Sequence, residues 1–171
     1  MHGNTAATDT AKNAARCLLA FGAPAHVRVY PGASKPLLGL AKHDPEIHGV
    51  DGLGGVQGLP AADSPEVQAL FAINDDGSTI RAIEGMARSI RDTWKNGNGN
   101  QVTIISTGPT TNIGAITVVR KLQIIDHIAA LFISVYPDLL IAVEEFVFMG
   151  GAVGLGNRSP VAGSCDFHSK Y

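Results

Sequence analysis

The sequence has little cysteine and little net charge. Cys17 and Cys165 are its only two cysteines, and they stand far apart without a Cys-x-x-Cys pair. This spacing argues against a disulfide framework and against a zinc site. The 13 Lys and Arg nearly balance the 15 Asp and Glu, which leaves a formal net charge of -2. Because binding to nucleic acid or to an anionic membrane surface needs a basic patch, we predict neither partner.

Three further signals are missing from the sequence. No basic stretch followed by an apolar run opens the chain, so we expect a cytoplasmic protein without a secretory signal. Residues 118–127 are interrupted by three charged side chains and therefore do not form a membrane span. No Gly-Lys-Ser or Gly-Lys-Thr loop occurs, and Gln57 stands where a dinucleotide-binding fingerprint starting at Gly52 needs its third glycine. A nucleotide-binding α/β domain is therefore not indicated.

The 171 residues suit one domain, which we expect to span residues 1–171. In its first part, the pattern predicts a helix over Thr8–Phe21, with Asp9 or Thr10 as its cap and Gly22 as its stop. The alternation in His26–Tyr30 predicts a short strand, and Pro36–Lys42 a helical turn. The expected buried face of the first helix, with a packed thiol, consists of Ala14, Cys17, Leu18 and Phe21.

The later part of the chain alternates helix and strand signals. Ser64-Pro65-Glu66 is typical of a helix start, and Asn74–Gly77 of a turn. Val102–Ile105 and the run Phe146–Phe148 are predicted to be strands, and the alternation favours an α/β fold with a mostly parallel sheet flanked by helices. Ser78–Trp94 is predicted to be an amphipathic helix, whose apolar face is formed by Ile80, Ile83, Met86, Ala87, Ile90 and Trp94.

Three glycine-rich segments follow one another in a fixed order. Glycine just after a strand lets the backbone turn sharply or approach a ligand, and in open parallel sheets ligands bind at that position. The second and third segments each follow a predicted strand. The segments are Ile47-His48-Gly49-Val50-Asp51-Gly52-Leu53-Gly54-Gly55, Ser106-Thr107-Gly108-Pro109-Thr110-Thr111-Asn112, and Met149-Gly150-Gly151 continuing to Gly156-Asn157-Arg158-Ser159-Pro160-Val161-Ala162.

In their order, spacing and amino-acid residues, these segments resemble the inosine/uridine-preferring nucleoside hydrolases, and most closely their fungal uridine-nucleosidase-like branch. The resemblance runs from Gly3 to about Ala162. It implies an enzyme that hydrolyses the N-glycosidic bond of purine or pyrimidine ribonucleosides to base and ribose, in nucleoside catabolism or salvage. It also implies a ribonucleoside as the small-molecule partner, and members of the family are often homo-oligomers.

The resemblance assigns roles to five positions. Asn4 corresponds to the family's ribose-contacting asparagine, Met149 to the methionine beneath the sugar, and Asn157 to the asparagine that binds its hydroxyls. His48 falls on the loop that borders the base. Thr107 should lend its backbone carbonyl to the Ca²⁺ ion that the family uses to orient the ribose diol and the attacking water.

Other family features have no counterpart in this sequence. We expect the first strand and its Asp-rich motif to be missing, together with the C-terminal part, so that the domain is an incomplete nucleoside hydrolase domain. The family's ribose-binding Glu and Asn fall on Gly163 and Cys165, and no catalytic residue is retained. The alternative function is therefore a catalytically inactive fragment, or a splice or gene-model remnant, that keeps only part of the ribose-binding wall.

One stretch departs from the family in the middle of the chain. Residues 117–129 match nothing in the family, whereas Thr111–Ile116 resembles the start of a family helix and Leu131–Leu140 its continuation. We interpret 117–129 as an insertion, and a longer helix peculiar to this protein is the alternative.

Overall fold

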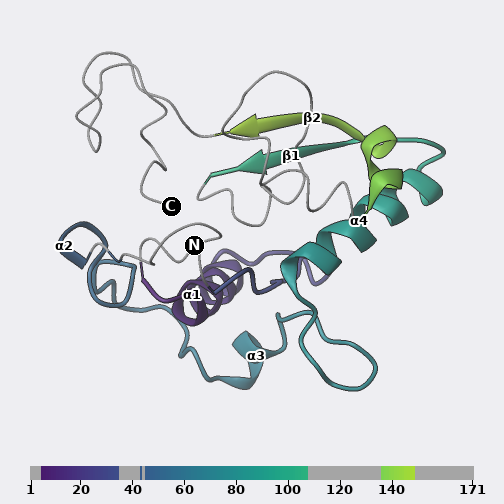
Figure 1. Ribbon diagram of the computed structural model, residues 1–171. Helices are drawn as coiled ribbons and strands as arrows, with labels where there is room; N and C mark the ends of the chain where they lie inside the picture. Colours follow the sequence, from purple (N-terminus) through teal and green to yellow (C-terminus); the bar gives the residue numbers. More distant parts are fainter. Residues whose placement is uncertain (1–4, 35–42, 44, 108–135, 149–171) are drawn as a thin grey trace, which may run out of the picture. The chain divides into compact units, whose positions relative to one another are not determined.

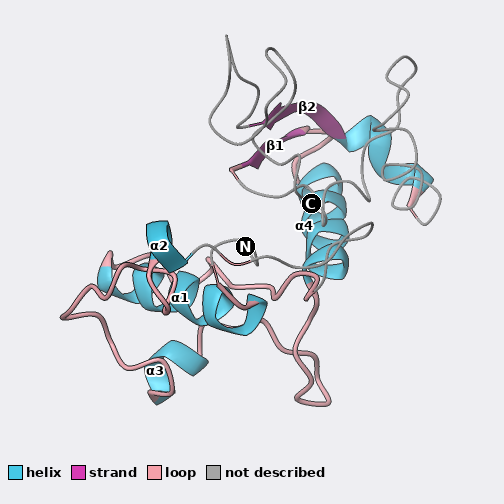
Figure 2. Ribbon diagram, turned by 60° about the vertical axis from the view of Figure 1, so that its left-hand side comes forward, coloured by secondary structure: helices cyan, strands magenta, loops and turns pink. Residues whose placement is uncertain are grey.

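The computed structural model describes residues 5–34, 43, 45–107 and 136–148, and these fall into two compact units (Figure 1). The first unit includes the described residues up to Gly85, and the second begins at Met86. Helices and a parallel pair of strands make the fold α/β, as predicted. Figure 2 shows how much of the chain between the longer helices is loop.

Helix α1 (Ala7–Ala20) forms much of the first unit, and its end confirms the predicted glycine stop. Gly22 has a φ of +65°, and its N–H donates to the carbonyl of Leu19 at 3.1 Å. The predicted start was wrong, because Ala6 is the N-cap residue and gives no side-chain bond. Thr10 lies inside the first turn instead, where its hydroxyl donates to the carbonyl of Ala7 at 3.0 Å.

The buried face of α1 also differs from the prediction. Ala15 is fully buried, with Ala11 and Leu18 beside it, whereas Phe21 is 87% exposed and Cys17 is only half-buried. Two stripes of apolar residues with helical spacing run along this helix. The stripe that contains Ala15 is the one that contacts helix α3 (Pro65–Gln68), where it packs against Val67.

Helix α3 starts as the sequence predicted. The Ser64 hydroxyl accepts a hydrogen bond from the N–H of Val67 at 3.3 Å, and Pro65 occupies the first turn, where its missing N–H costs nothing. Val67 is fully buried and completes a core with Ala15 and Val29. The predicted strand 26–30 is shorter than expected, because only Val29 forms a bridge, to Phe71.

Helix α4 (Ala82–Asn96) begins four residues later than predicted. The preceding residues are used in backbone pairing instead: Ser78 accepts from Asn74 at 2.8 Å, and Ile80 donates to Ala72 at 2.9 Å. Within the helix the predicted apolar face is confirmed, since Ala87 and Ile90 are at most 4% exposed. Ile80 is also buried, at 7%, but it lies before the helix.

The sheet of the second unit consists of β1 (Val102–Ser106) and β2 (Val143–Phe148), which run parallel (Figure 1). The 3-10 helix η1 (Pro137–Ala142) leads directly into β2. The predicted continuation of an α-helix through Leu140 was therefore wrong from Pro137 onward, because the proline opens a tighter helix there.

Several predictions fall outside the described residues, namely the turn at Pro36–Lys42, the helix start at Thr111–Ile116 and the insertion at 117–129. In the part of the chain that the structure describes, no helix is both long enough and apolar enough to cross a membrane.

Candidate functional site

The two parallel strands end side by side at one edge of their sheet. Ser106 is in register with Phe148, so the carboxyl ends of β1 and β2 coincide. Ser106 is 6% exposed, and Thr107, which follows it, is exposed. Ligands bind at the carboxyl edge of open parallel sheets. The structure thus places Thr107 at the edge where a binding site is expected.

The other predicted site residues are divided between the first unit and the undescribed parts of the chain. His48 is the last residue of helix α2 (Pro45–His48) in the first unit, and its side chain is half-buried. Asn4, Met149 and Asn157 lie outside the described residues. His48 and Thr107 therefore belong to different units.

The glycine-rich loop after His48 is closed by its own hydrogen bonds. The carbonyl of His48 accepts from the N–H of Gly54 at 2.7 Å. The carboxylate of Asp51 accepts through Oδ1 from the N–H of Leu53 at 3.0 Å and from that of Gly55 at 3.1 Å. An aspartate that binds the backbone just after it is a common way to fix a tight turn.

Helix α1 and Thr5, two residues before it, hold this loop from outside. The Asn13 side-chain amide donates to the carbonyl of Asp51 at 2.7 Å, and the Thr5 hydroxyl donates to the carbonyl of Val50 at 3.0 Å. Thr5 and Asn13 are 5% and 9% exposed. Gly52 has a φ of +77°, and a Cβ there would lie 2.5 Å from Cγ2 of Thr5, so only glycine fits against this anchor.

Arg16 of α1 binds the chain at Pro60, just after this loop. Its Nε donates to the carbonyl of Pro60 at 2.7 Å, and its Nη1 donates to Oδ1 of Asn13 at 3.3 Å. The N–H groups of Leu53 and Gly55 lower the pKa of the Asp51 carboxyl below its ordinary value, and the charge of Arg16 adds to this effect. Asp51 is therefore an anion at neutral pH.

These supporting residues were not identified from the sequence as functional. Asp51 stands in the first glycine-rich segment, and Asp-Gly is a recognised turn signal. Asn13 and Arg16, three residues apart on one helix, are a polar pair within an otherwise alanine-rich stretch. Nothing local indicates that their partners lie in a loop 38 or 44 residues further along.

The described residues do not fit a calcium site. Ca²⁺ takes about 6–8 oxygen ligands, several of them carboxylates. Within the described ranges, no group of three or more His, Cys, Asp or Glu side chains could hold a metal ion. The carbonyl of Thr107 is a single ligand.

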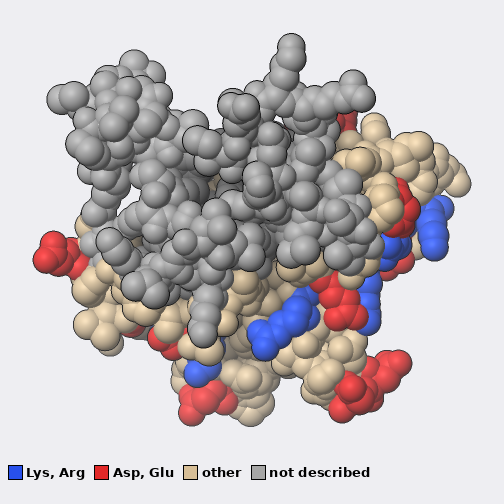
Figure 3. All heavy atoms as spheres, in the orientation of Figure 1, with Lys and Arg blue, Asp and Glu red and all other residues tan. Residues whose placement is uncertain are grey.

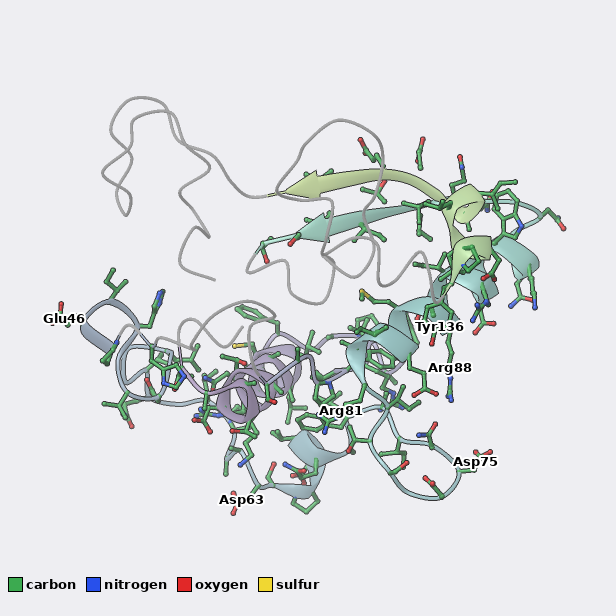
Figure 4. All side chains as sticks on the ribbon, in the orientation of Figure 1. Glu46, Asp63, Asp75, Arg81, Arg88 and Tyr136 are labelled. Atoms are coloured by element: carbon green, nitrogen blue, oxygen red, sulfur yellow. The ribbon has the colours of Figure 1, made fainter. Side chains whose placement is uncertain are left out.

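Charged side chains of both signs are interspersed on the described surface that faces the viewer in Figure 3. Glu46 on α2, Asp63 before α3 and Asp75 in the turn are spread around the first unit (Figure 4). On this face the described residues form no broad region of one sign.

The model of a protein family described as inosine-uridine preferring nucleoside hydrolase matches residues 1–164. The chain belongs to this family. The family prediction made from the three glycine-rich segments is therefore confirmed.

Individual relatives agree with this nucleoside hydrolase assignment. The chain is 32% identical to an uncharacterized protein of Schizosaccharomyces pombe over 157 residues, which cover 92% of this chain and 37% of the relative. It is also 32% identical to the pyrimidine-specific ribonucleoside hydrolase RihA of Salmonella schwarzengrund over 160 residues, which cover 94% of this chain and 40% of the relative. The chain thus spans about two fifths of the length of the curated relatives it matches.

Proposed function

We propose that the protein is a nucleoside N-ribohydrolase, and that the carboxyl edge of β1 and β2 forms part of its sugar site. The register of Ser106 with Phe148 supports this proposal, since Ser106 opens the second family segment and Phe148 is the residue before the third. Family membership over residues 1–164 supports the hydrolysis of an N-glycosidic bond to release base and ribose.

The chain's own residues would act in binding. Asn4 and Asn157 would hydrogen-bond the ribose hydroxyls, Met149 would lie beneath the sugar, and His48 would contact the base. Binding of this kind holds the sugar in the geometry in which its positive charge develops during bond cleavage. Thr107 is our candidate for one backbone-carbonyl ligand of a Ca²⁺ ion, which would orient the ribose diol and the attacking water if it were bound.

The proposed substrates are small ribonucleosides. Because one relative is named a pyrimidine-specific ribonucleoside hydrolase, uridine and cytidine are the first to test, followed by inosine. We further propose a cytoplasmic homo-oligomer that acts without nucleic acid or membrane partners.

The alternative is a chain that binds ribose but does not hydrolyse nucleosides. The chain spans 37–40% of the length of these relatives, and the test below distinguishes this alternative from the hydrolase. It would then be a remnant that keeps part of the ribose-binding wall.

Turnover and binding by the full chain distinguish the two. Release of uracil, cytosine or hypoxanthine is measured by chromatography in the presence of Ca²⁺, for the wild type, for Asn157→Ala and for Asn100→Ala. Asn100 is the control because it lies exposed in a loop outside the proposed site. Turnover that falls by about 10² or more only in Asn157→Ala supports the hydrolase.

Other outcomes reject parts of the proposal. Turnover that Asn157→Ala leaves intact contradicts the assigned sugar site. Saturable ribose binding without turnover supports the alternative function, and neither binding nor turnover contradicts both.

A further inference from the structure

The peptide group that joins His48 to Gly49 is held by a hydrogen bond at each of its ends. Its carbonyl accepts from Gly54 at 2.7 Å, and the next residue, Gly49, donates to the carbonyl of Pro45 at 2.9 Å. The direction in which the imidazole leaves the chain follows from this backbone. The position of Gly54 therefore influences the position of the His48 side chain.

Asp51 controls the position of Gly54. Its Oδ1 accepts from the N–H groups of Leu53 and Gly55, the two neighbours of Gly54. Gly54 and Gly55 both have positive φ, at +66° and +74°, and glycine has wide backbone freedom unless bonds restrict it. With both neighbours held by one carboxylate oxygen, the N–H of Gly54 stays directed at the carbonyl of His48.

Asp51 is itself held by a regular element. Asn13 of α1 binds the Asp51 carbonyl at 2.7 Å, and Asn13 is buried. The path thus runs from Asn13 of α1, through one hydrogen bond, to Asp51, whose carboxylate accepts from Leu53 and Gly55. Gly54 lies between these two residues and donates to the carbonyl of His48.

We propose that Asp51 is a positioning residue that fixes His48 for contact with the nucleobase, acting through the backbone of Gly54. This inference rests on the proposed function, in which His48 contacts the base. Asp51 itself points its carboxylate at the loop backbone and need not touch substrate.

The first test measures hydrogen exchange of the Gly54 amide by NMR on the full chain. In Asp51→Ala we expect exchange to become faster by about tenfold or more, because the bonds that hold its neighbours are lost. Asp51→Asn keeps an acceptor oxygen in the same place and should restore part of the protection. Asp76→Asn is the matched control, since Oδ1 of Asp76 also accepts from a backbone N–H two residues on, that of Ser78 at 2.8 Å.

The second test measures nucleoside turnover in a double-mutant cycle with His48→Ala. A residue that only positions His48 should raise KM when it is lost, by about tenfold, with a smaller effect on kcat. In the His48→Ala background, Asp51→Ala should then change KM by less than about twofold, because the group it positions is gone. If Asp51 had only a structural role, Asp51→Ala would raise KM by the same factor in the wild type and in His48→Ala.

Unchanged exchange at Gly54 in Asp51→Ala overturns the inference, and so do additive effects of Asp51→Ala and His48→Ala on KM. If the wild type has no nucleosidase activity, the proposed function fails, and the exchange rates alone decide whether Asp51 fixes the His48 backbone. The two failures are thus distinguishable.

Discussion

Arg91 and Asp138 form a two-point ion pair between α4 and η1. Nε of Arg91 lies 2.8 Å from Oδ2 of Asp138, and Nη2 lies 3.0 Å from Oδ1. The guanidinium also lies over the ring of Tyr136, labelled in Figure 4, with 4.9 Å between its carbon and the ring centroid. The pair therefore attaches the segment just before β2 to the helix before β1.

Replacing Arg91 by Lys should weaken this attachment. A lysine keeps the charge but loses the planar fork and the stacking on Tyr136. Because both side chains are partly exposed, at 33% and 57%, we expect the Tm of the chain to fall by at most about 4 °C. Arg81→Lys, at an exposed position just before α4, is the comparison by thermal denaturation. A larger fall in Tm for Arg81→Lys than for Arg91→Lys would contradict the assignment.

The same pair predicts a pH dependence. The hydrogen bond from Arg91 lowers the pKa of the Asp138 carboxyl below its ordinary value. A carboxyl with a lowered pKa in the folded state stabilises the protein above its unfolded-state pKa, and this contribution is lost as the pH falls through the folded-state pKa. The Tm difference between wild type and Asp138→Asn should therefore be constant from pH 7 to about pH 5 and shrink below about pH 4. A difference that grows on acidification would rule out this account.

Gly85→Ala should destabilise the first unit. Gly85 is buried in α4, and a Cβ there would lie 2.5 Å from Cε1 of Tyr30. The better helix propensity of alanine gains at most about 1 kcal/mol, whereas overpacking costs about 1–3 kcal/mol. Denaturant unfolding should show a net loss in the free energy of unfolding. Gly85→Ala should cost less when it is made in a Tyr30→Ala background. Ser89→Ala, exposed on the same helix, should be close to neutral.

Val67→Ala should remove a central contact of the core of the first unit. Val67 is fully buried against Ala15 and Val29, so two lost methyl groups leave a cavity. We expect a loss of about 1–3 kcal/mol in the free energy of unfolding. Val56, 48% exposed, gives the matched control, and Val56→Ala should cost less than about 0.5 kcal/mol. Equal losses in the two variants would contradict the assigned core.

Elements with local causes could be predicted from the sequence. The start of α3 depends on Ser64 and Pro65, which are neighbours, and the apolar face of α4 depends on spacing within one helix. β1 is a short run of β-branched residues and was predicted to within one residue. The start of α4 was missed because residues 78–80 pair with residues 72–74, a choice that no local pattern expresses.

The sequence by itself determined the family, because three glycine-rich segments in one order carry it, and the helices and strands whose signals lie within a few residues. Only the tertiary structure decided which stripe of α1 is buried, since two stripes share the helical spacing and α3 contacts one of them. It also decided the anchoring of Asp51 by Asn13, 38 residues away, and of Asp138 by Arg91, 47 residues away. A hydrogen bond between distant residues depends on where the chain folds back, and composition and periodicity do not contain that information.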